Sequence, residues 1–187
     1  MPRIRPVEYA EATPGQRAAH DKVVREQGRM TNMKRTLLHS LPAFRALMEW
    51  YPLRDTVQPF LGDRLTTIFA HAISSENDCL VWSTYFRRIL LESGEDPDQF
   101  ALDEHEKVVV EFGRRLAEPF GRVPDSLYAQ LAALFTGQQI VALTAFGAMM
   151  VATNVFNNAL AVDLDDYLEP YRKANSVPST APADGVA

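Results

Sequence analysis

The chain has 187 residues, of which 47% are hydrophobic and 23% charged, and its formal net charge is −5. This length and composition predict one globular domain with a core that needs neither disulfide nor metal. Scattered Lys and Arg residues and the negative net charge argue against nucleic-acid binding. The single cysteine, Cys79, excludes an intrachain disulfide, and the N-terminal residues contain no apolar run. Both features favour a cytoplasmic protein.

Proline residues and N-cap signals divide the chain into helices, and no segment has the pattern of a strand. We expect a single all-α domain at 13–173, preceded by an extended arm at 1–12 and followed by a disordered tail at 174–187. Within the domain the predicted helices are at about 14–27, 31–39 and 41–50, a short helix between Pro52 and Pro59, and helices at about 65–73, 79–90, 104–118, 126–134, 137–160 and 163–173.

One long segment, between Asp125 and Asp163, has no charged residue. Its apolar centre at 140–152 is about 13 residues long, shorter than the roughly 20 that a membrane span needs. We therefore predict a buried helix in a core or a subunit interface, and no membrane contact.

The segment around Cys79 contains the most informative residues. A helix that begins near Asn77 or Asp78 would place Cys79 in its first turn, where amide donors and the helix dipole lower the pKa of a thiol. The neighbouring Glu76 and Asp78 would raise it. A lone cysteine is also often a small buried apolar residue, so both interpretations stay open.

Two apolar helices joined by a break, with Asn77-Asp78-Cys79 at the start of the second, resemble the alkyl hydroperoxidase D and carboxymuconolactone decarboxylase superfamily. The later segment QQIVALTAFGAMMVATNVFNNAL is similar to the closing helix of that family, and the resemblance covers about 35–172. It implies an all-α fold with sites between packed helices, often at subunit contacts. It also implies a homo-oligomer, either a dimer, a trimer or a hexamer.

The peroxidase branch of that family carries Cys-x-x-Cys-x-x-x-His with a glutamate upstream. In this chain Cys79 matches the first cysteine, whereas Trp82, Phe86 and Thr67 stand at or near the positions of the second cysteine, the histidine and the glutamate. A two-thiol cycle is therefore impossible within one chain. Rings at Trp82 and Phe86 would suit a pocket for an apolar or aromatic substrate, although both could equally be core residues.

Other polar residues could replace the missing acid and base groups. His71, Ser75, Cys79 and Ser83 recur every four residues, so a continuous helix would place them on one face. A break at 74–77 would end that alignment and leave Glu76 as a cap of the second helix. His71 is either a base or a neutral core histidine.

Asn154, Asn157 and Asn158 end the uncharged helix, where they could bind a ligand or bond across a subunit interface. Arg87 and Arg88 could bind a carboxylate substrate or pair with nearby acids. We find no metal-binding motif and no cofactor fingerprint, and therefore expect neither metal nor cofactor.

Three functions follow from these residues and the resemblance. The first is a cofactor-free enzyme on the decarboxylase side of the family, with lyase or proton-transfer chemistry on a small organic acid or aromatic metabolite. His71 would be its base, with Cys79 or Glu76 nearby. The second is a one-cysteine hydroperoxide reductase that uses Cys79. The third is a catalytically silent oligomeric binding protein.

Overall fold

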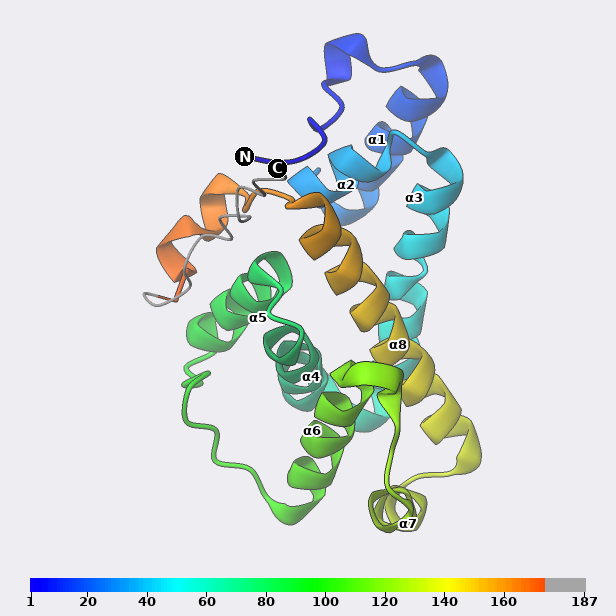
Figure 1. The fold of residues 1–187 in the computed structure, drawn as a ribbon, viewed down its shortest axis with the longest axis vertical. Helices are drawn as coiled ribbons and strands as arrows, with labels where there is room; N and C mark the ends of the chain where they lie inside the picture. The colour runs from blue at the N-terminus through cyan, green and yellow to red at the C-terminus, as the bar shows by residue number, and fades with distance from the viewer. Residues whose placement is uncertain (174–187) are drawn as a thin grey trace, which may run out of the picture.

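The computed structural model describes residues 1–173, and in this part of the chain helices are the only regular elements (Figure 1). The predicted tail at 174–187 lies outside the described residues. The α-helices are α1 (Pro14–Gln27), α2 (Asn32–Leu37), α3 (Leu41–Met48), α4 (Trp50–Glu76), α5 (Leu80–Glu92), α6 (Glu104–Ala117), α7 (Asp125–Leu134) and α8 (Gly137–Leu160). Three 3-10 helices complete the set: η1 (Tyr9–Glu11), η2 (Pro119–Gly121) and η3 (Asp166–Tyr171).

Local capping explains where most helices begin. The Thr13, Asp103 and Thr136 side chains each accept a hydrogen bond from the backbone three residues on, within complete capping boxes. Thr31 and Ser40 cap α2 and α3 in the same way without the reciprocal bond. These starts confirm the sequence predictions.

The core is organised around α4, which packs against α5, α6 and α8 (Figure 1). Phe69 of α4 is completely buried and stacks on Phe146 of α8, with ring centroids 6.0 Å apart. Gly113 of α6 and Gly147 of α8 face this ring, and their missing side chains let the three helices approach closely. The close packing of α4, α6 and α8 therefore forms the centre of the domain, and α5 packs against α4 beside it.

Four predicted boundaries or helix types differ from the structure. The helix predicted at 41–50 ends at Met48, and a new helix begins at Trp50. The short helix after Pro52 is the first part of α4, which kinks at Gly62, where φ is 76° and ψ is 163°. The terminal helix predicted at 163–173 is the shorter 3-10 helix η3, which contains Pro170 and so lacks one backbone donor. The arm at 1–12 is not extended throughout, because it includes η1.

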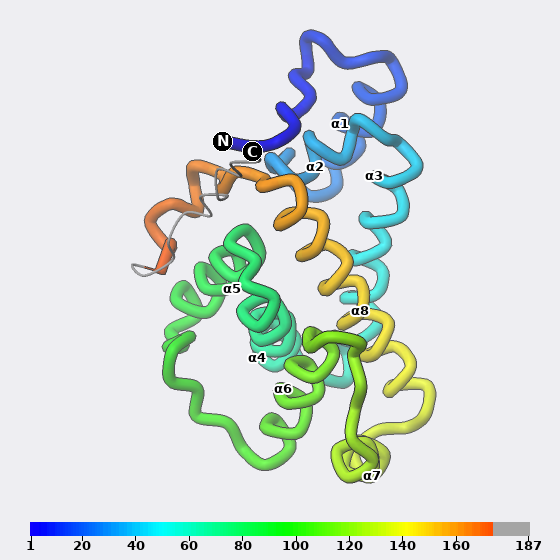
Figure 2. Tube along the Cα trace, viewed as in Figure 1, coloured from blue at the N-terminus to red at the C-terminus, as the bar shows by residue number. Residues whose placement is uncertain are grey.

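The N-terminal arm and the uncharged helix meet at one end of the domain (Figure 2). The Arg3 backbone N–H donates to Leu160 O, and its guanidinium donates to Ala159 O, at the C-terminus of α8. By length and composition alone α8 could cross a membrane. Its inner residues Leu143, Phe146 and Met150 are nevertheless completely buried, so the helix is the core helix that the sequence predicts.

Candidate functional site

The break between α4 and α5 positions Cys79. α4 ends at Glu76, Asp78 adopts a left-handed conformation with φ of 48°, and Cys79 is the N-cap of α5 without a side-chain cap bond. This break ends the four-residue alignment of His71, Ser75, Cys79 and Ser83 that a continuous helix would give. Glu76 is exposed at the end of α4, so its predicted role as a cap of the second helix is wrong.

Cys79 itself is sealed inside the protein. Its exposed fraction is 0%, and its sulfur accepts a hydrogen bond from Asn157 Nδ2 at 3.8 Å. Burial raises the pKa of the Cys79 thiol above its ordinary value, although the amides of Trp82 and Val81 at the start of α5 and the Asn157 side chain lower it in part. The thiol is therefore protonated at neutral pH, and the helix N-terminus does not turn it into a thiolate.

The asparagines at the end of α8 hold this break in place. Asn154 Nδ2 donates to Asn77 Oδ1 at 3.2 Å, and Asn158 Nδ2 donates to Asn77 O at 2.8 Å. Asn77 Nδ2 in turn donates to Ala117 O of α6. These amide donors therefore have partners inside the chain. Within residues 1–173, Asn154 Oδ1 and Asn157 Oδ1 are the buried side-chain oxygens that lack one.

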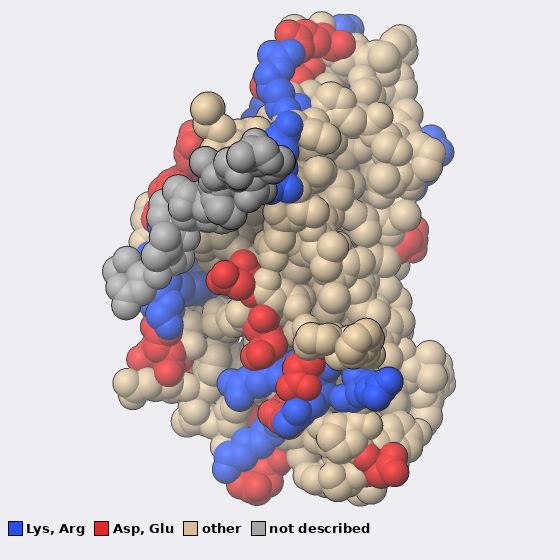
Figure 3. Space-filling model, viewed as in Figure 1, with Lys and Arg blue, Asp and Glu red and all other residues tan. Residues whose placement is uncertain are grey.

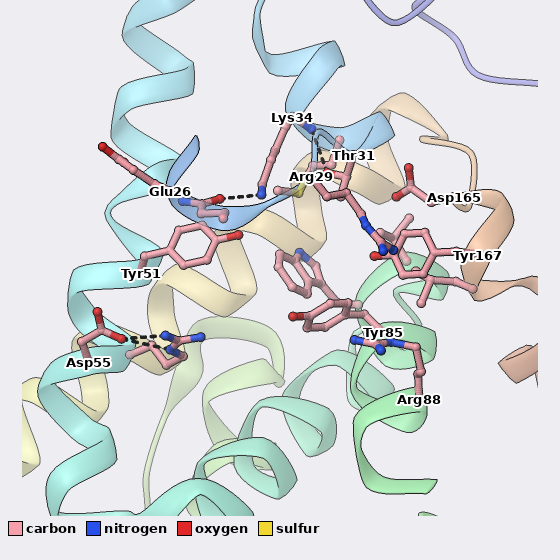
Figure 4. Close-up of a pocket in the computed structure, with 16 residues that line it drawn as sticks. Glu26, Arg29, Thr31, Lys34, Tyr51, Asp55, Tyr85, Arg88, Asp165 and Tyr167 are labelled. Carbon is pink, nitrogen blue, oxygen red and sulfur yellow. Dashed lines mark hydrogen bonds and ion pairs between the residues drawn. The ribbon is translucent and has the colours of Figure 1, made fainter. Parts of the chain in front are cut away.

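A cavity of about 570 Å³ lies on the other side of α5, between α2, α4, α5 and η3 (Figure 4). In Figure 4, Lys34 and Tyr51 lie on one side of it, and Tyr85, Arg88 and Tyr167 on the other. Its volume is in the range of small-molecule sites. The lining residues are Glu26, Gln27, Arg29, Thr31, Met33, Lys34, Tyr51, Arg54, Asp55, Val81, Trp82, Tyr85, Arg88, Asp165, Tyr167 and Leu168.

An aromatic stack forms the inner wall of this cavity. Trp82 lines the cavity and stacks on Trp50, with ring centroids 5.3 Å apart. Phe86 stacks on Trp82, with ring centroids 5.4 Å apart, but its side chain is only 3% exposed and does not line the cavity. Of these two rings, Trp82 therefore faces the cavity and Phe86 packs behind it in the core.

The cavity also presents several cations. Arg29 lies over the Tyr167 ring at 3.9 Å, and Arg88 lies between the Tyr85 and Tyr167 rings, 5.5 and 5.8 Å from their centroids. Arg88 also pairs with Glu92 at 2.8 Å, and Arg54 pairs with Asp55. Trp82 Nε1 and Arg88 Nε are buried donors without a partner in the described part of the chain. An acceptor group of a ligand would satisfy such donors.

Four titratable side chains of the cavity have shifted pKa values, namely Lys34, Tyr51, Asp165 and Tyr167. Burial lowers the pKa of Lys34 to about 8, against an opposing attraction from Asp165. Burial raises the pKa of Tyr51 and that of Asp165, although the Asn32 N–H donates to Asp165 Oδ1 at 2.8 Å. In each of these groups, and in Tyr167, burial is the largest cause and shifts the pKa in the direction that disfavours the charged form.

The remaining sequence candidates lie away from this cavity. His71 packs edge-on against the Phe100 ring, with centroids 6.0 Å apart, and burial with nearby Arg87 lowers its pKa to about 4. Thr67 donates to Asp63 O and Ser83 to Leu80 O, whereas Ser75 is exposed. Of the residues that the sequence predicts for catalysis or binding, Trp82 and Arg88 line the cavity, whereas Arg87 pairs with Asp98 away from it.

The sequence patterns missed most of the cavity. Lys34, Tyr51, Arg29, Asp165 and Tyr167 come from segments far apart in the chain. No sequence pattern marks Lys34, which lies between Met33 and Arg35 in the short helix α2. No group of three or more His, Cys, Asp or Glu within residues 1–173 could hold a metal ion.

Charged side chains elsewhere do not form a basic surface on the face shown in Figure 3, where Lys and Arg lie beside Asp and Glu in the lower part. Arg115, for example, bonds both Glu111 and Glu118.

Solved structures similar to this chain share one fold. A peroxidase-related protein from Ralstonia eutropha, described as an alkylhydroperoxidase AhpD core, matches with a TM-score of 0.72 and 18% identity over 89% of this chain and 94% of that chain. The debrominase Bmp8 matches with a TM-score of 0.73 and 14% identity over 90% and 95%. A Bmp8 variant with one cysteine replaced by alanine, solved with 2,3,4-tribromopyrrole, gives a TM-score of 0.74 and 13% identity over 90% and 94%.

No protein-family model and no curated protein matches the sequence. The structural matches cover nearly the whole domain, and they show that the chain has the alkyl hydroperoxidase D-like fold. This result confirms the resemblance and the all-α fold predicted from the sequence. At such low sequence identities the similarity shows the fold alone and does not establish the function.

Proposed function

We propose that this chain is a small-molecule enzyme that binds an aromatic organic acid in the cavity between α2, α4, α5 and η3. It acts by lyase or proton-transfer chemistry, without a thiol nucleophile and without a cofactor. The observation that carries this proposal is the pairing of aromatic walls with cations around one cavity of about 570 Å³.

The lining supports an aromatic ring with a negative group. Trp82, Tyr85 and Tyr51 supply apolar ring surface, which favours stacking with a planar substrate. Arg29 and Arg88 supply positive charge, and the unpartnered Trp82 Nε1 and Arg88 Nε suit an anionic acceptor. The bound tribromopyrrole of the Bmp8 variant is likewise an aromatic ring held by this fold.

Cys79 argues against the peroxidase hypothesis. A one-cysteine reductase needs an accessible thiolate, whereas the Cys79 side chain is completely buried and its pKa is raised. His71 lies outside the cavity beside Phe100, so the proposal assigns it no contact with the substrate.

Calorimetric titration with naphthoate tests the binding step. We expect Trp82→Leu and Arg88→Gln each to weaken naphthoate binding at least tenfold, because they remove a ring wall and a cation of the cavity. Arg87→Gln is the matched control for charge, since Arg87 is on the same helix but pairs with Asp98 outside the cavity. Naphthalene methanol, which lacks the carboxylate, should bind more weakly than naphthoate. Equal binding to all three variants would contradict the proposal.

Turnover distinguishes an enzyme from the silent binding protein of the third hypothesis. The wild type should release carbon dioxide or exchange a carbon-bound proton of aromatic keto acids, and Cys79→Ala should retain that activity. Tight binding with no chemical change over long incubation would instead support the binding protein.

We also propose that the chain forms a homo-oligomer. The outer face of α8, a helix without charged residues, exposes Val141 and Val155, with exposed fractions of 70% and 57%. Sedimentation of the wild type and of Val155→Glu tests this: the variant should dissociate, and a monomeric wild type would contradict the proposal.

A further inference from the structure

Lys34 is an unusual lysine in this protein. Its exposed fraction is 4%, and it lines the cavity from the short helix α2. Its Nζ donates to the neutral amide oxygen Oε1 of Gln27 at 2.6 Å and lies 5.2 Å from the centroid of the Tyr51 ring. Within residues 1–173 it forms no ion pair, whereas Lys107 pairs with Glu104.

This environment increases the neutral fraction of the Lys34 amine compared with that of an exposed lysine. Burial lowers the pKa of Lys34 to about 8 from an ordinary value of 10.5, and Asp165 is the charged group that opposes the shift. About a tenth of Lys34 is then unprotonated at pH 7, compared with about one in 3000 for an ordinary lysine. A neutral amine is the nucleophilic form, so Lys34 combines access to the cavity with reactivity.

The neighbouring groups suit an addition to a carbonyl. Burial raises the pKa of the Tyr51 hydroxyl, so it stays protonated and can donate to a carbonyl oxygen. Figure 4 shows the Lys34 amine and the Tyr51 ring on the same side of the cavity. Arg29 and Arg88 line the same cavity and can hold a carboxylate of the substrate.

We propose that Lys34 is a reactive amine that condenses with the carbonyl carbon of an aromatic aldehyde or keto acid bound in the cavity. This inference rests on the proposed function and deepens it, because it names the substrate class and the residue that attacks it. The other residues that the sequence suggests for catalysis, Cys79 and His71, do not line the cavity.

The step balances without a further co-reactant. The Nζ lone pair adds to the carbonyl carbon, the carbonyl π pair moves to oxygen, and one proton passes from nitrogen to that oxygen. The carbinolamine then takes a proton from an acid of the solvent and loses water as the C=N bond forms, while the Tyr51 hydroxyl donates a hydrogen bond to the departing oxygen. The nitrogen returns its remaining proton to the acid, so amine and carbonyl give imine and water. Water reverses the step and releases the product.

Reductive trapping tests this inference on the wild-type chain. The full chain is incubated with para-formylbenzoate and cyanoborohydride at pH 7, and the modified amines are located by peptide mass spectrometry. The sequence has few competitors, namely Lys22, Lys107, Lys173 and the N-terminal amine. We expect labelling of Lys34 at least tenfold faster than that of Lys22 or Lys107.

The N-terminal amine is the internal reference, because Met1 does not line the cavity. Labelling of Lys34 should saturate with aldehyde concentration and be blocked by naphthoate, whereas labelling of the N-terminus should show neither effect. Lys34→Arg should abolish the saturable labelling, and Lys107→Arg should retain it. Labelling of Lys34 no faster than that of Lys22 would overturn the inference.

The two proposals fail in different ways. Naphthoate binding without trapping at Lys34 would overturn the reactive amine and leave the aromatic-acid site standing. Absence of naphthoate binding would overturn the proposed function itself. Saturable trapping at Lys34 that naphthoate does not block would contradict the placement of both ligands in one cavity.

Discussion

Replacement of Lys34 by Met should stabilise the protein. Methionine keeps the apolar part of the side chain and removes the buried charge. The lowered pKa of Lys34, about 8 instead of 10.5, corresponds to a penalty of about 3 kcal/mol for keeping it charged in the folded state. Loss of its bond to Gln27 and its contact with Tyr51 costs roughly 1–2 kcal/mol. The net gain at pH 7 is therefore about 1–2 kcal/mol.

The stability difference between the wild type and Lys34→Met should depend on pH. The folded protein releases the Lys34 proton near pH 8, whereas the unfolded chain keeps it until about pH 10.5. Between these values the unfolded state binds more protons, so rising pH stabilises the wild type relative to Lys34→Met. The difference in free energy of unfolding should shift toward the wild type by about 2.5 kcal/mol between pH 7 and pH 10.

Urea unfolding of both proteins at the two pH values measures this shift. Lys107→Met is the matched control, because Lys107 is an exposed lysine that pairs with Glu104. Its difference from the wild type should stay within about 0.5 kcal/mol at both pH values. A variant Lys34→Met that is destabilised at pH 7, with no change in the difference at pH 10, would refute the reasoning.

Three further predictions concern the core. An aromatic disulfide reagent should label Cys79 at least about 1000-fold more slowly in the native protein than in urea. The reason is that the reagent reaches the buried thiol only after a local unfolding that costs about 4 kcal/mol, which corresponds to that factor. Equal labelling rates would show that the thiol is accessible. As pH falls from 6.5 toward 4, His71 binds a proton in the unfolded chain but not in the folded protein, because its pKa in the folded protein is about 4. The free energy of unfolding should therefore fall by up to about 3 kcal/mol over this range, and a His71→Gln variant should lack this pH dependence. Gly113→Ala should destabilise by about 1–3 kcal/mol, because its Cβ would lie 2.9 Å from the buried Phe69 ring, whereas Gly137→Ala, with nothing within 4 Å, should change little in thermal unfolding.

Local features of the fold could be predicted from the sequence because their causes are local. The N-cap at Thr13 and the capping boxes at Asp103 and Thr136 depend only on residues close in sequence, and the structure contains all three. The break before Cys79 was visible as polar residues between two apolar stripes. The kink at Gly62 was not, because Pro59 and Gly62 left open whether the helix would stop or continue.

The cavity could not be predicted, because it depends on contacts between distant segments. Trp82 was identified by its place in a family motif, whereas Arg29, Lys34 and Tyr167 approach it only when α2 and η3 pack beside α5. Sequence rules place a lysine at the surface, and they give no sign that α2 buries Lys34. The competing effects on Cys79 were named correctly, but only the structure shows that burial outweighs the helix N-terminus.

A crystal structure of the wild type with naphthoate bound would locate the substrate site. The ring should lie against Trp82 and Tyr85, with the carboxylate within hydrogen-bond distance of Arg29 or Arg88 and with Cys79 still enclosed. A ligand seated beside the Cys79 sulfur or the His71 ring, with the cavity between α2 and α5 empty, would contradict the proposed site.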